Sequence, residues 1–230
     1  MQIHGFQKMT MLDYPGKVAC TLFTAGCNFR CPFCHNALLV TEIDRAAAYD
    51  FEEILSYLKK RKGILDGVAI TGGEPLMNRD IPELLKQLKS LGYAVKLDTN
   101  GSYPDLLREI VSAGLADYIA MDIKNSKEKY ALTVGLPKFD LAPVEESVRF
   151  LLSGAVDFEF RTTVVKEFHT EADIAAIADW IQGAPRYFLQ SFKESDHMIG
   201  SGLHAHDAET LGRMRDIAAR KIPVTALRGV

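Results

Sequence analysis

The chain has 230 residues, of which 47% are hydrophobic and 25% are charged, and its formal net charge is −3. This is the composition of an ordinary globular protein, and 27 basic against 30 acidic residues is too even a balance for a protein that binds nucleic acid through bulk charge. No apolar run approaches the roughly 20 residues of a membrane-spanning helix, and residues 1–16 lack a secretion-signal pattern. The sequence therefore argues against a nucleic-acid partner, a membrane span and export.

Short apolar segments alternate with longer amphipathic segments along the chain. The helical segments place apolar residues at i, i+3, i+4 and i+7, as in Ile81, Leu84, Leu85 and Leu88. Strands are predicted at residues 18–25, 67–71, 94–98, 118–123, 157–164 and 187–192, where Val, Ile, Phe and Tyr gather. Helices are predicted at residues 51–62, 81–90, 104–113, 144–153, 171–181 and 208–220.

This alternation of strand and helix predicts an α/β fold with a parallel sheet. An open doubly wound sheet and a barrel or partial barrel are both compatible with it. No Gly-, Ser- or Pro-rich linker interrupts the pattern, so we expect one domain over residues 1–230, with the segment 207–230 packed on it.

Polar residues cluster just after the predicted strands, or near their ends. They lie in the segments Gly72-Gly73-Glu74, Asp98-Thr99-Asn100 and Asp122-Ile123-Lys124, and at Arg161 and Gln190. In parallel α/β folds the carboxyl ends of the strands form the ligand-binding face. The sequence therefore predicts a single site on that face.

The four cysteines are crowded near the N-terminus, and Cys27, Cys31 and Cys34 have the spacing CxxxCxxC. Crowded cysteines without an export signal favour metal binding in a reducing compartment over disulfides, and the cytoplasm is the default. A [4Fe-4S] cluster held by three cysteines would leave one iron open, whereas structural zinc needs four ligands, the fourth being Cys20 or His35. Cys20 lies inside an apolar run, so we expect it to be buried and not to bind metal.

The CxxxCxxC motif after the first predicted strand, together with Gly-Gly-Glu-Pro after the second, resembles the radical S-adenosylmethionine (SAM) enzymes. The resemblance spans residues 13–192. It implies a partial (β/α)6 barrel of the TIM-like type, a [4Fe-4S] cluster on Cys27, Cys31 and Cys34 in the loop 27–34, and SAM bound to the open iron. Reductive cleavage of SAM would then release a 5′-deoxyadenosyl radical.

Four further motifs resemble the activating enzymes of glycyl-radical enzymes. They are Asp13-Tyr14-Pro15-Gly16, Cys34-His35-Asn36, Leu97-Asp98-Thr99-Asn100-Gly101 and Asp122-Ile123-Lys124. The short chain and the first motif are most similar to the activating proteins of anaerobic ribonucleoside-triphosphate reductase. The resemblance implies hydrogen abstraction from a glycine of a partner enzyme, with a flavodoxin- or ferredoxin-type electron donor.

The resemblance also implies roles in cofactor binding for particular residues. Phe33 would pack near the adenine, and the backbone of His35 would lie over the cofactor. Gly72 and Gly73 would allow close backbone approach, and Glu74 would pair with the amino group of SAM. Lys124 would meet the SAM carboxylate, while Arg161 and Gln190 would face the cofactor or the incoming peptide.

Asp98 and Asp122 are like charges predicted to end adjacent strands, so a cation or a cationic ligand should lie between them. The resemblance to the pyruvate formate-lyase activase implies a monovalent cation held by Asp98, Thr99, Asp122 and the backbone of Ile123. Gln190 stands where that activase has a histidine, which argues against pyruvate formate-lyase as the partner.

Two other functions compete with the activase. One is a radical SAM enzyme acting on a small molecule such as a deazapurine precursor, and the other is a zinc-stabilised binding protein without catalysis. His197, His204 and His206 surround a Gly-Ser-Gly segment, where a mobile loop is favoured over a second metal site. The absence of further cysteines predicts that no auxiliary cluster is present.

Overall fold

The computed structural model describes residues 2–43, 48–195 and 197–230. Its centre is a single sheet of eight strands in the order β1-β2-β3-β4-β5-β6-β7-β8. The strands are β1 (Ile3–Thr10), β2 (Ala19–Thr24), β3 (Gly67–Gly72), β4 (Ala94–Thr99), β5 (Tyr118–Asp122), β6 (Asp157–Val164), β7 (Tyr187–Ser191) and β8 (Thr225–Arg228). Strands β2 to β8 are all parallel, and only β1 runs antiparallel to its neighbour.

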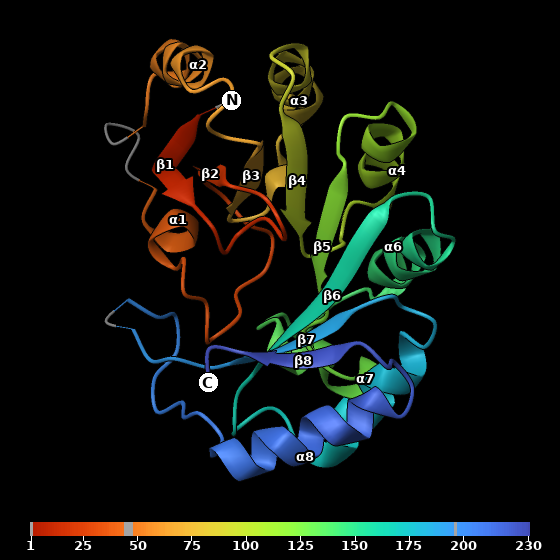
Figure 1. Ribbon diagram of the computed structural model, residues 1–230. Coiled ribbons are helices and arrows are strands. Elements are labelled where there is room, and N and C mark those ends of the chain that lie inside the picture. Colours follow the sequence, from red (N-terminus) through yellow and green to blue (C-terminus); the bar gives the residue numbers. More distant parts are fainter. Residues whose placement is uncertain (1, 44–47, 196) are drawn as a thin grey trace.

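The helices cover the outer side of this curved sheet (Figure 1). The longer ones are α2 (Phe51–Lys60), α3 (Ile81–Ser90), α4 (Pro104–Ser112), α6 (Ala142–Leu152), α7 (Glu171–Trp180) and α8 (Ala208–Ala219). Short elements at the strand ends are α1 (Leu38–Thr41), η2 (Pro75–Met77), η3 (Lys127–Lys129) and α5 (Tyr130–Thr133). Among the described residues, no helix is both long and apolar enough to span a membrane.

The predicted parallel α/β fold is confirmed, with six strands and six helices close to their predicted ranges. The apolar stripe of α3 packs inward, since Ile81, Leu84, Leu85 and Leu88 are all buried. Strand β6 and helix α3 begin and end at the predicted residues.

The prediction missed the two edge strands. Strand β1 adds an antiparallel edge beside β2, and β8 adds a parallel edge beside β7, so the segment 207–230 contributes a strand as well as a helix. The strand ladder runs linearly from β1 to β8 in the described part of the chain, and these two edges are not paired with each other. The sheet therefore forms an incomplete barrel with an open side.

Candidate active site

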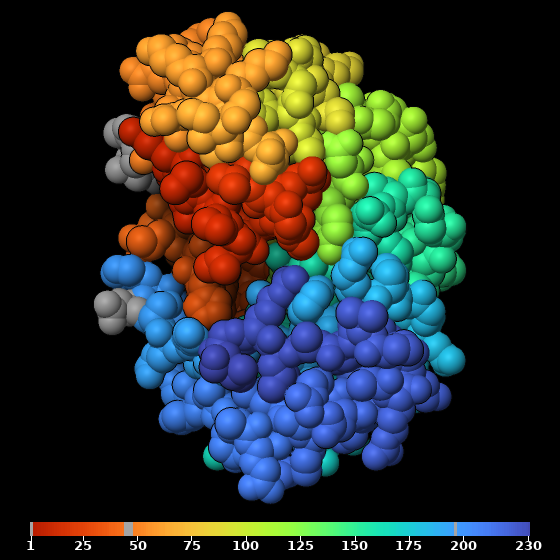
Figure 2. Space-filling view, in the orientation of Figure 1, coloured from red at the N-terminus to blue at the C-terminus, as the bar shows by residue number. Residues whose placement is uncertain are grey.

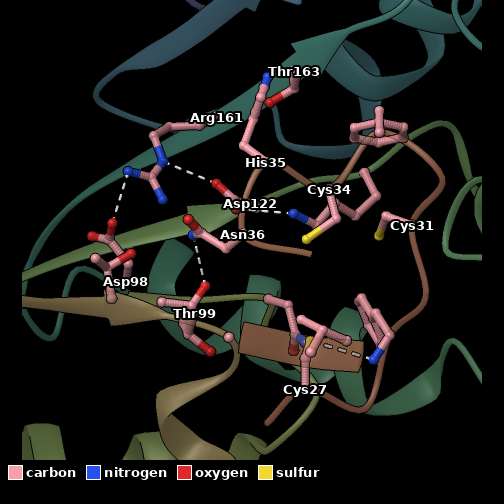
Figure 3. Close-up of a pocket in the computed structure, with 18 of the residues that line it drawn as sticks. Cys27, Cys31, Cys34, His35, Asn36, Asp98, Thr99, Asp122, Arg161 and Thr163 are labelled. Carbon is pink, nitrogen blue, oxygen red and sulfur yellow. Dashed lines mark hydrogen bonds and ion pairs between the residues drawn. The ribbon is translucent and has the colours of Figure 1, made fainter. Parts of the chain in front are cut away.

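The three cysteines of the CxxxCxxC motif lie in the loop that follows β2. Their side chains line one cavity of about 240 Å³ at the carboxyl ends of the strands. The same cavity is lined by the ends of β3, β4, β5 and β6 and by Gln190 of β7. The predicted ligand-binding face is therefore where the sequence placed it, and in Figure 3 the cysteines surround the same space.

Segments from distant parts of the sequence hold the cysteine loop in place. The Arg30 N–H donates to the carbonyl oxygen of Val134 at 2.9 Å, and the Gly200 N–H donates to the carbonyl oxygen of Pro32 at 2.8 Å. His35 Nε2 lies 2.8 Å from the carbonyl oxygen of Lys193. Gly200 packs closely against the loop, because a Cβ there would lie 2.7 Å from the Cβ of Pro32. The loop is thus positioned by the α5 end and by the segment after β7.

Burial dominates the acid–base chemistry of the cysteines. It raises the pKa of Cys27 to about 11 and that of Cys31 to about 12, and it also raises the pKa of Cys34. Nearby Lys124 acts in the opposite direction on all three thiols. Cys31 is buried and Cys27 and Cys34 are half-buried. Thiols in such surroundings need a strongly positive centre before they ionise, and a metal ion or cluster would supply it.

The chemistry of these side chains fits an iron–sulfur cluster, because cysteine thiolates are the usual ligands of such clusters. Within the described ranges, no group of three or more His, Cys, Asp or Glu side chains lies close enough to hold one metal ion. In an iron–sulfur cluster each cysteine binds a different iron, so the thiols need not converge on one point. The donor set fits a [4Fe-4S] cluster with three protein ligands.

Cys20 does not join this group. It lies on β2, is fully buried and is not part of the cavity lining. The prediction that Cys20 is buried is confirmed.

Gly72 and Gly73 allow the end of β3 to approach the start of the cysteine loop. Gly72 has a φ of +114°, and a Cβ on Gly73 would lie 2.0 Å from the carbonyl oxygen of Gly26. The Gly72 carbonyl oxygen accepts a hydrogen bond from the Asn36 side chain at 2.9 Å. The glycines therefore serve packing and also leave an open backbone edge on the cavity.

Glu74 is fully buried and does not line the cavity. Its carboxylate accepts hydrogen bonds from the Leu76 N–H at 3.0 Å, the Thr99 hydroxyl at 2.8 Å and the Asn100 N–H at 2.6 Å. Burial raises its pKa to about 7, against the opposing effect of these donors. Glu74 thus joins the end of β3 to the end of β4.

A chain of alternating charges crosses the interior of the barrel (Figure 3). Arg161 on β6 donates from Nε to Asp122 at 2.9 Å and from Nη1 to Asp98 at 3.1 Å. Lys96 pairs with the other oxygen of Asp98, and Lys124 pairs with the other oxygen of Asp122 at 2.9 Å.

These cations decide the protonation of the two aspartates. Burial alone would raise both pKa values. The positive charge of Arg161 has the largest opposing effect on both aspartates, and Lys96 adds to it at Asp98 and Lys124 at Asp122. The pKa of Asp98 is therefore lowered, and that of Asp122 falls to about 2.

The residues expected to hold a monovalent cation all have protein partners in this structure. The Thr99 hydroxyl donates to Glu74 and accepts from the Gly101 N–H at 3.1 Å. The Ile123 carbonyl oxygen accepts from the Thr162 hydroxyl at 2.7 Å, and Ile123 is not part of the cavity lining. Every carboxylate oxygen of Asp98 and Asp122 is also paired to a cationic side chain.

Phe33, His35 and Gln190 all line the cavity, as predicted for cofactor-binding positions. The Phe33 ring is buried and packs against Phe168, at a centroid distance of 5.8 Å. The His35 ring stacks on Phe192 at 5.8 Å.

Two of the C-terminal histidines have protein partners. His204 pairs with Glu167 at 2.7 Å, and His206 Nε2 lies 2.8 Å from the carbonyl oxygen of His169.

The sequence analysis gave no individual role to several residues in and around the site. Asn100 contacts Asn28 at 3.0 Å, although the Asp-Thr-Asn-Gly motif that contains it was noticed. His169 is fully buried, and its Nε2 lies 2.8 Å from the carbonyl oxygen of Lys124, which fixes that segment. A charged residue within an apolar strand, such as Lys96 on β4, was an available signal for the barrel interior.

Comparison with known proteins agrees with this geometry. Residues 21–181 match the family model described as "Radical SAM superfamily". The chain belongs to the radical SAM superfamily. It is therefore a radical SAM enzyme, and the family implies a [4Fe-4S] cluster and SAM, for which the three cysteines and the cavity provide suitable residues.

Several known proteins are similar to different parts of this chain. A protein of Methanocaldococcus jannaschii named "Putative glycyl-radical enzyme activating enzyme MJ1227" is 31% identical over 84% of this chain and 81% of its own length. A protein of Saccharolobus solfataricus named "Probable GTP 3',8-cyclase" is 36% identical over 51% of this chain and 38% of its own. The crystal structure of Streptococcus suis SuiB bound to S-adenosylmethionine has the same fold, with a TM-score of 0.71 and 17% identity, over 90% of this chain and 49% of that one.

Proposed function

We propose that this radical SAM enzyme removes a hydrogen atom from a glycine Cα of a partner enzyme and so activates it. The partner proposed is an anaerobic ribonucleoside-triphosphate reductase. The observation that supports an activase most is the relative from Methanocaldococcus jannaschii, whose similarity extends over most of both chains. The Asp13-Tyr14-Pro15-Gly16 opening supports the choice of partner.

The cavity residues divide the work of holding the two cofactors. Cys27, Cys31 and Cys34 would hold the cluster, and the backbone edge at Gly72 and Gly73 would lie along SAM. Phe33, His35, Thr99 and Gln190 would line the rest of the bound cofactor. When both are bound, cluster and SAM supply a carbon-centred radical that takes a hydrogen atom from a C–H bond, with the electron coming from a flavodoxin- or ferredoxin-type donor.

The charges of the cavity would orient SAM. Lys124 lies close enough to all three thiols to lower their pKa values. Burial lowers the pKa of Lys124 itself, but Asp122 and Cys31 outweigh burial and hold this pKa above the usual range. Lys124 therefore stays protonated and can receive the SAM carboxylate.

The open side of the barrel supplies a route for a protein substrate. A second cavity of about 370 Å³ lies there, bounded by Leu12, Asp13 and Pro15 on one side and by Arg228 and Gly229 on the other. It shares Asp98, Arg161 and Gln190 with the cysteine-lined cavity, so the two are adjacent. Figure 2 shows a recess between the N-terminal segment in red and the C-terminal segment in dark blue.

A glycine is well suited to this route. It has no side chain to block the approach, and the flanking amide groups stabilise the radical that remains on its Cα. An extended peptide entering beside Leu12 would pass Gln190, whose side-chain amide can both donate to and accept from a peptide backbone. The breaking bond is the glycine Cα–H, and the hydrogen forms a new C–H bond in 5′-deoxyadenosine.

The proposal is tested by mixing the reconstituted protein anaerobically with the reductase, SAM and a reductant. A doublet electron paramagnetic resonance signal is expected on the reductase, and replacing its radical glycine by Ala should remove the signal. The match to a GTP cyclase makes GTP and a deazapurine precursor the appropriate small-molecule controls. Rapid turnover of either one without a protein partner would replace the activase by a small-molecule enzyme.

A further inference from the structure

Asp98 and Asp122 pose an electrostatic problem, because two carboxylates lie side by side in a buried cavity. Asp98 is the last but one residue of β4 and Asp122 is the last residue of β5, on neighbouring parallel strands. Buried like charges are costly unless cations compensate them. The compensating cations are found among the side chains of this chain.

Arg161 reaches the space between the two carboxylates from β6. Its guanidinium spans both of them, with Nε on Asp122 at 2.9 Å and Nη1 on Asp98 at 3.1 Å. A guanidinium presents several N–H donors in a fixed plane, so one side chain can bind two carboxylates in defined positions. The Arg161 side chain is only 12% exposed, which keeps water from screening these contacts.

The charge count leaves no need for a further ion. Lys96, Arg161 and Lys124 carry three positive charges, and Asp98 and Asp122 carry two negative ones, so the group is already positive. A sodium or potassium ion in the same space would meet three cationic side chains at short range, which is unfavourable in a buried site. The hydroxyl of Thr99 and the carbonyl of Ile123 are also engaged elsewhere.

We propose that the Arg161 guanidinium is a built-in replacement for the monovalent cation, so that this enzyme binds SAM independently of sodium and potassium. Arg161 thereby acts as a positioning residue that fixes Asp98 and Asp122 and, through Asp122, the ammonium group of Lys124. Removing the guanidinium frees Asp98 Oδ2 and Asp122 Oδ1, the two oxygens that face it, and so creates a cation site.

The test measures the dissociation constant of SAM for the anaerobically reconstituted protein in potassium, sodium or tetramethylammonium chloride at equal ionic strength. The wild-type constant should be the same in all three salts. For Arg161→Gln, SAM should bind about tenfold more weakly in tetramethylammonium, because two buried carboxylates lose their shared partner, and potassium or sodium should restore much of the loss. The melting temperature of Arg161→Gln should likewise rise with potassium or sodium, as expected when an ion binds only the folded state.

Arg108→Gln is the matched control. Arg108 also bridges two carboxylates, those of Asp105 and Glu146, but it lies on α4 outside the cavity. Its replacement should create no dependence of SAM binding on the salt.

Two results would overturn the proposal. One is a wild-type affinity for SAM that depends on potassium or sodium, and the other is a folded Arg161→Gln variant that responds equally to all three salts. If Arg161→Gln fails to fold in every salt, the wild-type measurement decides alone. No partner enzyme is needed, so the outcome is independent of the proposed activase function.

Discussion

Burial sets the chemistry of the individual residues at this site. The three motif cysteines resist ionisation, with the pKa of Cys31 raised to about 12. The paired aspartates stay ionised although burial also acts to raise their pKa values. The difference is the partner: each aspartate oxygen has a cationic side chain, and the thiols have none of their own. A cluster that brings positive iron to the thiols completes the balance.

The ligand assignment can be checked one cysteine at a time. Anaerobically reconstituted protein should carry about four irons and four sulfides per chain. Replacing Cys27, Cys31 or Cys34 by Ala should abolish the cluster, whereas the buried Cys20→Ala variant should keep it. Iron and sulfide analysis provides the measurement, and loss of iron from the Cys20 variant would show that the ligand set is wrong.

The raised pKa of Glu74 should make the free energy of unfolding depend on pH. Burial raises its pKa from 4.5 to about 7, so between these values the folded state keeps a proton that the unfolded state releases. Its contribution to the free energy of unfolding should therefore fall as the pH rises through this window, by about 3 kcal/mol in total. Urea unfolding of wild type and Glu74→Gln across this range measures the difference.

The control for this experiment is the exposed Glu53→Gln on α2, which should keep the wild-type pH profile. A Glu74→Gln protein whose stability falls with pH as steeply as the wild type would contradict the assignment.

At the level of residues, the sequence was informative wherever a motif carries its own chemistry. Nearly all the polar residues expected at the strand ends line the cavity, because parallel strands bring their carboxyl ends together. Glu74 and Ile123 do not, since their partners lie on other strands and only the folded chain shows those partners. The role of Arg161 between two aspartates depends on three strands at once.

The elements around the cysteine loop determine how firmly it is held. The segment after β7 touches the loop through Gly200, which is packed against Pro32. Strand β8 is fixed in turn by Arg228, whose guanidinium makes two hydrogen bonds to the buried Glu159, at 2.6 and 3.0 Å. The first contact joins a C-terminal segment to the cysteine loop, and the second joins β8 to the buried Glu159 on β6.

A Gly200→Ala substitution should loosen the cysteine loop. The new Cβ would lie 2.7 Å from the Cβ of Pro32, so one of the two backbones has to shift. We expect the reconstituted cluster of this variant to lose iron to a chelator several times faster than the wild-type cluster does. The decay of the cluster's visible absorbance measures the rate. Gly212→Ala on α8, where a Cβ meets nothing within 4 Å, should leave that rate unchanged and stabilise the helix by about 1 kcal/mol. Equal rates of iron loss for the two variants would show that the contact between Gly200 and Pro32 does not hold the cysteine loop.

The elements that the sequence missed have weak patterns for physical reasons. Strand β1 contains Gly5, Gln7 and Lys8, and much of it is exposed at the edge, so it lacks an apolar run. Strand β8 has only four residues, all partly buried, and its register depends on β7. Central strands such as β3 were predictable because burial on both faces selects a continuous apolar segment.

On the scale of the whole molecule, the incomplete barrel leaves a side entrance to the cysteine-lined cavity. The exposed Leu12 is 90% accessible at the rim of this entrance, and Met9 and Met11 nearby are also exposed. Such an apolar rim suits contact with a protein segment.

Leu12→Asp should therefore impair activation of the partner. We expect fewer glycyl radicals for each SAM cleaved, counted by spin quantitation and by 5′-deoxyadenosine analysis, because a charge at the rim disfavours peptide entry. Leu132→Asp on α5, which is exposed but does not line either adjoining cavity, should keep the wild-type ratio. An unchanged ratio for Leu12→Asp would place the peptide route elsewhere.

The central claim, hydrogen abstraction from a partner glycine, is tested most directly by isotope transfer. The partner reductase is prepared with glycine deuterated at Cα and mixed anaerobically with the reconstituted protein, SAM and reductant. Mass spectrometry of the 5′-deoxyadenosine should show one deuterium, gained in proportion to the glycyl radical formed. Cleavage of SAM with no deuterium in the product, while the partner acquires no radical, would contradict the claim.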